Sequence, residues 1–346
     1  GLSVRRATRP GSARGLKYAK IIQGRAYLLI VRKNVADPLR GRPVLVTGAN
    51  GFVASYLIPR LTELGASVHG VDLDERSKVQ GCEYHCLDLL NFGCIKSFVA
   101  QYRPCFVFHL ASQSSVGTSW KHEWRTIETN TRSVYNLLKA VEKLSLSVRI
   151  LLVSSIEVYG DHGRRKVNVG DDLRPANPYA VSKAAMEMIA HKFSHSTIEF
   201  VIARSSNHTG PGRSEMFFEA NVAKQFAQAK YSGKKSISVK VGNVENIRDY
   251  SDVRDVVEKY IFLACQGEAG KTYNVCSGTG TRLSRIIEML EECSGIAARV
   301  EVDRSRLRKN DIAYLVGVNH IRLKSRPLPE SIEDLYRYFL EQCPLR

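Results

Sequence analysis

The feature that most constrains the fold of this chain is a glycine-rich turn between an apolar run and an amphipathic stretch. Val44-Leu45-Val46 is apolar and rich in β-branched residues, which favours a buried strand, and the residues from Phe52 to Leu64 have helical spacing. Between them lies Thr47-Gly48-Ala49-Asn50-Gly51-Phe52-Val53-Ala54. Glycines in such a turn let backbone N–H groups and a helix N-terminus approach a pyrophosphate. The turn therefore predicts a dinucleotide site with these contacts: Gly48, Asn50, Gly51, Phe52 and Val53.

Apolar runs of strand length alternate with helical patterns such as Ile127 to Leu144. The further runs are Ser67–Asp72, Cys105–Leu110, Arg149–Ser154, Glu199–Arg204 and Lys271–Cys276. This alternation predicts an α/β fold with a doubly wound parallel sheet of the Rossmann type. Because it weakens after Arg204, we expect a smaller C-terminal substrate-binding lobe. The expected dinucleotide-binding domain covers residues 43–206, with 243–278 returning to it, and the lobe covers 207–242 and 279–346.

Positive charge is concentrated at the N-terminus. The formal net charge is +17, but residues 1–42 hold 11 Lys and Arg against one acid, Asp37. The remaining excess of seven positive charges suits an enzyme with an anionic substrate and requires no nucleic acid. We expect residues 1–42 to be a poorly ordered extension, with an organelle-targeting segment as an alternative. No apolar run approaches the roughly 20 residues of a membrane span, so no membrane partner is expected.

Eight cysteines are spread through segments that read as strands and helices. A chain of this size needs no disulfide staples, so we expect reduced thiols and a cytoplasmic location. Cys82, His85, Cys86 and Cys94 suggest a metal site at first sight. On an extended strand, however, Cys82 and Cys86 lie roughly 13 Å apart at about 3.3 Å per residue. That separation does not suit a tetrahedral zinc site, and we expect no metal.

Acidic residues follow the second and third expected strands. Asp72 lies 24 residues after Gly48, close to the spacing of about 20 residues at which an acid binds the ribose hydroxyls of NAD. A carboxylate there repels the 2′-phosphate of NADP, although Arg76 offers a partner for it. NAD is therefore the favoured cofactor, with NADP left open. Asp88 would meet the adenine edge or cap a helix. Backbone at nearby strand ends completes the expected cofactor site: Leu89, Leu110 and Ala111.

Tyr179-Ala180-Val181-Ser182-Lys183 places a phenol and an ammonium on one face of a helix. A nearby cation favours the phenolate, so we expect a lowered pKa for Tyr179. The phenol would then exchange a proton with a sugar hydroxyl or ketone while hydride moves to or from nicotinamide. Such a pair often arises by chance. Here it follows Ser154–Gly160 at the end of a strand, where ligands bind in doubly wound sheets.

From about Pro43 to its end, the chain resembles the extended short-chain dehydrogenase/reductase family. Within that family it is most similar to the GDP-mannose 4,6-dehydratases and GDP-4-keto-6-deoxy-mannose reductases. The stretches that carry the likeness are TGANGFVA (47–54), HLASQSSVGTSW (109–120), VSSIEVYG (153–160), NPYAVSKAAMEM (177–188), ARSSNHTGPG (203–212), VGNVENIRDYSDVRDVV (241–257) and YNVCSG (273–278). The resemblance implies an NAD(P)-dependent enzyme that acts on a sugar nucleotide.

The resemblance also implies roles for individual residues. Ser155, Tyr179 and Lys183 would form the catalytic triad, with Lys183 also holding the nicotinamide ribose. Glu157 takes the place of the acid/base that removes the C5 proton during dehydration. The implied substrate contacts are Gln113 and Ser115 for the hexose, Asn207 and Arg248 for the sugar diphosphate, and Arg308 with Asp311 for the far end of the nucleotide.

Two stretches favour the reductase branch: Gln113–Gly117 and Asn207–Gly212. We therefore expect reduction of a GDP-4-keto-6-deoxy-hexose, with Tyr179 as the proton donor. The alternatives are a GDP-mannose 4,6-dehydratase, another sugar-nucleotide epimerase or decarboxylase, and a non-catalytic nucleotide-sensing scaffold. Ile156 stands where dTDP-glucose dehydratases have an aspartate, which disfavours that activity. The family resemblance further implies a homodimer through two helices per subunit, near Ile127–Leu144 and Pro178–His195.

Overall fold

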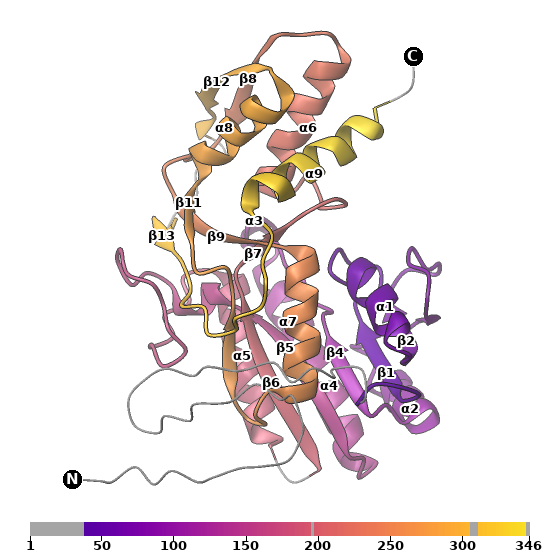
Figure 1. Ribbon diagram of the computed structural model, residues 1–346. Helices are drawn as coiled ribbons and strands as arrows, with labels where there is room; N and C mark the ends of the chain where they lie inside the picture. The colour runs from indigo at the N-terminus through magenta and orange to yellow at the C-terminus, as the bar shows by residue number, and fades with distance from the viewer. Residues whose placement is uncertain (1–37, 195–196, 305–310, 344–346) are drawn as a thin grey trace, which may run out of the picture.

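A parallel seven-stranded sheet forms the base of the molecule (Figure 1). The computed structural model describes residues 38–194, 197–304 and 311–343. The strand order is β10-β6-β5-β4-β1-β2-β3. The strands are β1 (Pro43–Thr47), β2 (Ser67–Asp72), β3 (Glu83–Cys86), β4 (Phe106–His109), β5 (Val148–Ser155), β6 (Ile198–Ser205) and β10 (Thr272–Val275). The expected doubly wound Rossmann sheet is confirmed.

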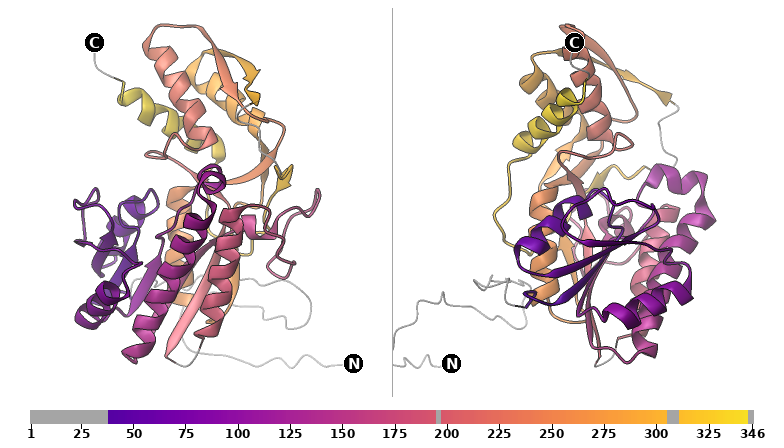
Figure 2. Two further views of the ribbon diagram at one scale, coloured as in Figure 1. Left: turned by 180° about the vertical axis from the view of Figure 1, so that it is seen from behind. Right: turned by 90° about the vertical axis from the view of Figure 1, so that its right-hand side faces the viewer.

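Helices cover both faces of this sheet (Figure 2). One face carries α1 (Ala54–Glu63) and α7 (Val253–Gln266). The other carries α2 (Phe92–Tyr102), α4 (Glu123–Lys143) and α5 (Pro178–Lys192). Two separate apolar cores result, because the central strands are buried on both faces and each face packs against its own helices. The short helices α3 (Val116–Lys121) and η1 (Ile156–Tyr159) lie at the carboxyl ends of the strands.

The strand order reverses at β1, which has β2 on one side and β4 on the other. In doubly wound sheets, ligands bind in the crevice outside the carboxyl ends of the strands at this switch point. The glycine-rich turn follows β1 and packs against the end of β4, so it lies at the switch point. The topology thus places the predicted dinucleotide turn where a ligand site is expected.

A smaller lobe stands above the carboxyl ends of the sheet (Figure 1). It contains α6 (Phe218–Tyr231), β8 (Ser236–Val241), α8 (Leu283–Ser294), β12 (Ala297–Val302) and α9 (Leu328–Glu341). Residues such as Phe226, Ile286 and Leu335 form its own apolar core. A four-stranded sheet lies between the lobe and the large sheet and consists of β7 (Asn207–Thr209), β9 (Ile247–Asp252), β11 (Gly280–Arg282) and β13 (Tyr314–Leu315).

Residues 243–278, which we expected to return to the dinucleotide-binding domain, divide between the large sheet and the four-stranded sheet. Within residues 243–278, β10 pairs with β6 and α7 packs on the large sheet, whereas β9 pairs with β7, β11 and β13 outside it. Four of the six residues of β9 are polar or charged and buried, so they need the polar partners of the connecting sheet. Of the expected N-terminal extension, residues 1–37 lie outside the described residues, and Leu39 is fully buried against α1.

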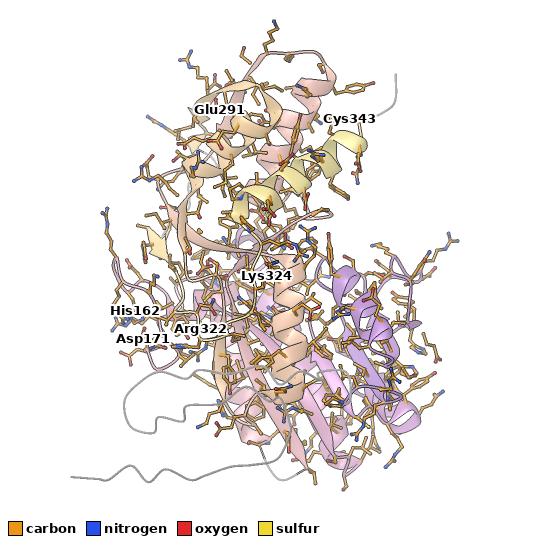
Figure 3. The ribbon with its side chains drawn as sticks, viewed as in Figure 1. His162, Asp171, Glu291, Arg322, Lys324 and Cys343 are labelled. Atoms are coloured by element: carbon orange, nitrogen blue, oxygen red, sulfur yellow. The ribbon has the colours of Figure 1, made fainter. Side chains whose placement is uncertain are left out.

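The chain after β13 returns alongside α7 (Figure 1), and Ile321 enters the core beneath that helix. Figure 3 labels Arg322 and Lys324 on this segment and His162 with Asp171 in the loop that follows η1. The two segments meet where Val167 forms a parallel bridge with Gly317. Among the described residues, no helix is long and apolar enough to cross a membrane.

Candidate active site

A cleft of about 1650 Å³ separates the large sheet from the smaller lobe. Pockets for single small molecules commonly measure about 300–1,000 Å³, so this cleft has room for a dinucleotide and a second ligand. The predicted site residues that line it are Gly48, Gly51, Phe52, Val53, Asp72, Asp88, Leu89, Leu110, Ala111, Gln113, Ser115, Ser155, Glu157, Tyr179, Lys183, Asn207, Arg248 and Asp311. Asn50 is not part of the lining, and Arg308 lies outside the described residues.

The glycine turn is shaped to bring the backbone close to a ligand. Gly48 has φ +71°, and a Cβ atom there would lie 2.9 Å from the backbone nitrogen of Ala111. A Cβ on Gly51 would lie 3.0 Å from the carbonyl oxygen of Gly48. Helix α1 begins with Val53 as its N-cap, without a side-chain cap or an acidic first turn. Its N-terminal N–H groups are therefore free of a competing carboxylate, which fits a pyrophosphate.

Asn50 organises the loop that follows β2. Its Nδ2 donates to Asp74 Oδ2 at 3.1 Å, to the Arg76 carbonyl at 3.0 Å and to the Tyr84 hydroxyl at 3.1 Å. Its Oδ1 accepts from the Lys78 backbone N–H at 2.7 Å. With both ends of the amide engaged, the side chain positions this loop and faces away from the cleft.

Acidic side chains stand at the ends of β2 and β3. Asp72 Oδ2 accepts from the Asn50 backbone N–H at 2.9 Å, and its Oδ1 accepts from Leu73 N–H at 2.7 Å. The carboxylate is therefore fixed at the edge of the cleft beside the glycine turn. Asp88 is exposed and accepts from Leu90 N–H at 2.8 Å, whereas the cap of α2 is Asn91. The helix-capping alternative for Asp88 is thus wrong.

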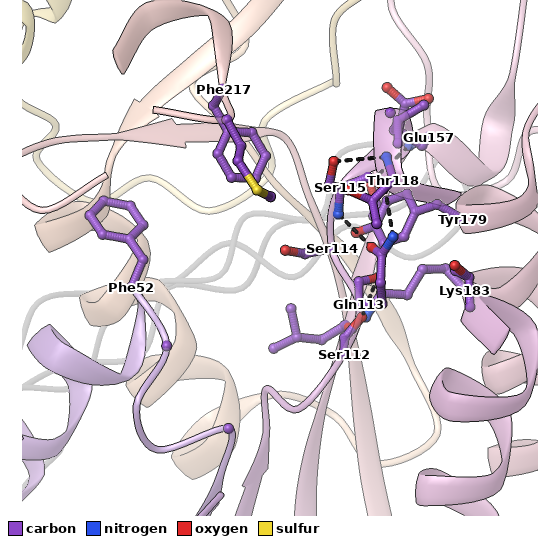
Figure 4. Close-up of a pocket in the computed structure, with 18 of the residues that line it drawn as sticks. Phe52, Ser112, Gln113, Ser114, Ser115, Thr118, Glu157, Tyr179, Lys183 and Phe217 are labelled. Atoms are coloured by element: carbon purple, nitrogen blue, oxygen red, sulfur yellow. Dashed lines mark hydrogen bonds between the residues drawn. The ribbon is translucent and has the colours of Figure 1, made fainter. Parts of the chain in front are cut away.

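Ser155 on β5 lines the cleft together with Tyr179 and Lys183 on α5. Figure 4 shows the side chains of Tyr179 and Lys183. Ser155 ends β5, and its hydroxyl lies close enough to Tyr179 to lower the pKa of the phenol. Helix α5 begins sharply at Asn177, whose side chain accepts from Ala180 N–H at 2.8 Å, with Pro178 in the first turn. This cap fixes where the first helical turn starts, and so it sets the direction in which Tyr179 and Lys183 project.

Burial governs the charge of Lys183. The residue is 3% exposed, and its ammonium donates to the Val153 carbonyl at 2.8 Å. Desolvation lowers the pKa of Lys183 to about 7, although Glu187 works in the opposite direction. Glu187 itself is engaged by Arg204, whose guanidinium lies 2.7 Å from its carboxylate. The lysine is therefore poised to gain or lose its charge near neutral pH.

The pKa of Tyr179 is raised to about 12, which corrects the expectation of a lowered value. Burial is the main cause, Glu157 adds to it, and the hydrogen bond from Ser155 offsets part of it. Lys183 is not among the groups that shift this pKa. Its ammonium lies over the tyrosine ring, 5.8 Å from the centroid, and donates to the Val153 carbonyl. The phenol is consequently protonated at neutral pH.

Glu157 lies beside this group in η1 and lines the cleft. Its Oε2 accepts from Asn177 Nδ2 at 3.1 Å, and its backbone N–H donates to the Ser155 hydroxyl at 3.2 Å. The carboxylate is therefore held by the residue that caps α5. It stands close enough to Tyr179 to influence the pKa of the phenol.

The serine-rich loop after β4 forms the wall opposite Phe52 (Figure 4). Gln113 Nε2 donates to the Ser115 carbonyl at 3.0 Å, and its Oε1 accepts from Ser115 N–H at 2.6 Å. The Ser115 hydroxyl caps α3 by accepting from Thr118 N–H at 3.1 Å. These bonds fold both side chains onto their own loop, and both residues line the cleft.

The connecting four-stranded sheet and the residues beside it contribute polar groups to the cleft. Arg248 donates to Asp311 at 3.1 Å, and Asn246 Nδ2 donates to the same carboxylate. Asn207 hydrogen-bonds the buried Tyr250. Arg248 and Asp311 therefore form one ion pair, with Asn207 on a neighbouring strand.

Arg213 also lines the cleft, and the sequence reasoning missed it. Its guanidinium carbon lies 3.4 Å from the ring centroid of Phe217 and 5.2 Å from that of Phe52. Its Nε donates to the buried Glu219 at 3.3 Å. The only signal in the sequence is its place directly after the turn Gly210-Pro211-Gly212.

Comparisons with known proteins place the chain in a family. A model of the GDP-mannose 4,6 dehydratase family matches residues 45–328. GDP-6-deoxy-D-mannose reductase from Pseudomonas aeruginosa is 34% identical over 283 residues, which cover 81% of this chain and 89% of that protein.

Two solved structures share the fold. One, RMD from Pseudomonas aeruginosa complexed with NADPH, has a TM-score of 0.75 and 27% identity and covers 87% of this chain and 99% of that one. The other, UDP-glucose 4-epimerase from Thermus thermophilus in complex with NAD, has a TM-score of 0.76 and 26% identity and covers 86% and 98%. The chain therefore belongs to the GDP-mannose 4,6-dehydratase family, among the extended short-chain dehydrogenases/reductases that modify sugar nucleotides with NAD(P).

Proposed function

We propose that the protein reduces a 4-keto-6-deoxy-hexose carried on GDP. The observation that carries this proposal is the position of Tyr179, which lines the cleft together with Ser155 and whose pKa is raised to about 12 by burial. A reductase needs a proton donor at this position, and a phenol with a raised pKa holds its proton at neutral pH. The likeness to a GDP-6-deoxy-D-mannose reductase supports the same direction of reaction.

In this reaction a ketone gains a hydride on carbon and a proton on oxygen. When bound at the glycine turn, a reduced nicotinamide supplies the hydride and becomes oxidised. Ser155 donates a hydrogen bond to the keto oxygen, and Tyr179 transfers its phenolic proton to that oxygen as the alcohol forms. Lys183, in its charged form, holds the nicotinamide ribose.

NAD is the proposed cofactor, and NADP stays possible. Asp72 supports NAD because its fixed carboxylate at the end of β2 suits ribose hydroxyls and repels a 2′-phosphate. Arg76 is exposed in the next loop and offers a phosphate partner, and one related structure holds NADPH. A comparison of kcat/KM for NADH and NADPH decides between them.

The diphosphate of the substrate is proposed to bind at the lobe side of the cleft. Arg248 and Arg213 provide planar guanidinium groups that match phosphate oxygens, and Asn207 adds an amide. The backbone of the Gln113–Ser115 loop faces the hexose. Arg308, which lies outside the described residues, and Asp311 remain the proposed contacts of the nucleotide end.

Dehydration of GDP-mannose is the second candidate, because Glu157 lies beside Tyr179 and suits removal of a C5 proton. Incubation with GDP-mannose and oxidised nicotinamide separates the two. A reductase leaves this substrate unchanged, whereas a dehydratase releases water without net change in the nicotinamide. Glu157→Gln would abolish that dehydration and would leave reduction of a supplied keto sugar within a few-fold of wild type.

We also propose that the protein forms a homodimer through α4 and α5. These helices pack side by side and carry large apolar side chains on their outer surface, with Tyr135 41%, Val181 39% and Met188 65% exposed. The ring of Tyr135 on α4 lies 5.7 Å from that of the buried Phe193 at the end of α5, so the two helices are in contact beside these exposed side chains. An exposed apolar patch of this kind is typical of a protein interface.

A further inference from the structure

Three side chains with metal-binding chemistry share one face of the large sheet near its outer edge. His69 on β2 is the register partner of Glu83 on β3, and His85 follows two residues later on β3. Residues two apart on a strand point to the same face, and register partners in a parallel sheet do so as well. Strand pairing therefore gathers two imidazoles and one carboxylate, although His69 is 14 residues from Glu83 in the sequence.

The distances within this group suit a tetrahedral ion. His69 Nδ1 lies 3.4 Å from one Glu83 oxygen, and His85 Nε2 lies 3.5 Å from the other. One ligand atom from each of the three residues falls within 4.8 Å of the others. Zinc binds nitrogen and oxygen at about 2.0–2.1 Å, so neighbouring ligands of a tetrahedral site are about 3.4 Å apart.

The two facing nitrogen atoms have no hydrogen-bond partner. His69 Nδ1 and His85 Nε2 are both buried and unsatisfied, and His69 is only 8% exposed. Buried polar atoms are almost always paired in folded proteins, and an unpaired one calls for an explanation such as an ion.

Helix α2 covers the group and orients it. The Tyr102 hydroxyl donates to Glu83 at 3.1 Å, and the Tyr102 ring lies 4.4 Å from that of His69 and 4.8 Å from that of His85. Phe98 packs against His85 at 5.0 Å. Metal ligands are commonly held by such outer contacts. The Glu83 side chain is 57% exposed, so the group is open to solvent on one side.

We propose that His69 Nδ1, His85 Nε2 and a Glu83 carboxylate oxygen bind a divalent zinc-type cation, with water as the fourth ligand. The ion would tie the edge strand β3 to β2. This site replaces the expectation of no metal and differs from the cysteine cluster first considered. Cys82 packs against the core on the opposite face of the sheet, because it alternates with Glu83 along the chain. The site is independent of the proposed reductase activity.

Zinc content tests the proposal. The full-length chain is stripped with a chelator, dialysed against micromolar Zn²⁺ and analysed for bound zinc by atomic emission. We expect about one zinc per chain in the wild type and a loss of that zinc in His85→Asn. Two control variants, His191→Asn and Cys86→Ser, each remove an exposed residue of a type that binds metals but lies outside the proposed site. We expect both variants to keep the zinc.

Glu83→Ala provides the second variant, because this exposed residue can be changed without disturbing the core. We expect its affinity for zinc to fall about tenfold or more. Loss of a residue that only supports a metal ligand commonly lowers metal affinity by about this factor, and loss of a ligand should cost at least as much. Zinc should raise the Tm of the wild type and leave that of Glu83→Ala nearly unchanged. A wild-type chain that binds no zinc, a fully loaded His85→Asn, or loss of zinc in Cys86→Ser would overturn the proposal.

Discussion

The proton of Tyr179 is held by burial, and the ammonium of Lys183 does not release it because it points to Val153. Tyr179→Phe removes only the phenolic hydroxyl, and with it this proton. We expect the rate of ketone reduction to fall about 10²–10⁴-fold, the usual contribution of a positioned acid, while dinucleotide binding measured by fluorescence stays the same. Tyr135→Phe, on the exposed face of α4, serves as the control. An unchanged rate in Tyr179→Phe would remove the phenol from the mechanism.

Lys183 sets the pH range of activity. An ordinary lysine titrates near pH 10.4, but desolvation lowers the pKa of Lys183 to about 7. The ammonium is therefore present below about pH 7 and is lost as the pH rises through this value. We expect kcat/KM, which reports groups of the free enzyme, to decline above about pH 7. Lys183→Arg keeps its charge and should lose this decline, even where its overall rate is lower.

Arg213 joins the proposed diphosphate site to the aromatic rings of Phe52 and Phe217. A hydrogen bond to a charged group contributes about 1.5–3 kcal/mol, so Arg213→Ala should raise the KM for the sugar nucleotide about tenfold or more. Arg174→Ala removes an exposed arginine outside the cleft lining and should leave KM unchanged. Equal KM values for both variants would exclude Arg213 from substrate binding.

The turn between β1 and α1 requires glycine at position 48 for two reasons, the backbone angle of that residue and the closeness of neighbouring backbone. Gly48 and Gly295 have the same φ of +71°, but only Gly48 would place a Cβ against neighbouring backbone. In Gly295→Ala we expect a loss of about 1 kcal/mol in the free energy of unfolding, with normal cofactor affinity. In Gly48→Ala we expect a greater loss of stability together with weaker dinucleotide binding. Titration calorimetry and thermal unfolding of the two variants measure this difference.

Local pattern was sufficient to predict the β1–α1 unit and the Tyr179/Lys183 pair, because strand and helix periods and a glycine turn are properties of neighbouring residues. Position 213 carried no such pattern, since its aromatic partner Phe52 is far away in the sequence. The cluster at His69 depends on strand pairing, and the pKa of Tyr179 depends on burial. Neither property follows from spacing along the chain.

At the scale of the whole molecule, helix α5 on the large sheet supplies Tyr179 to the cleft, and strand β9 of the connecting four-stranded sheet supplies Arg248. The proposed dimer lies away from this cleft, on the outer side of α4 and α5. Met188→Glu should place a charge within the apolar patch and shift sedimentation from dimer to monomer. A wild-type protein that sediments as a monomer at all concentrations would contradict the proposed interface.

The proposed reduction is tested most directly by supplying the protein with GDP-4-keto-6-deoxy-mannose and either NADH or NADPH and following the absorbance of the reduced nicotinamide. We expect the wild type to oxidise one nicotinamide for each keto sugar converted to its 4-hydroxy product, and Tyr179→Phe to oxidise none. Absence of nicotinamide oxidation with this substrate, together with loss of water from GDP-mannose, would contradict the proposed reduction.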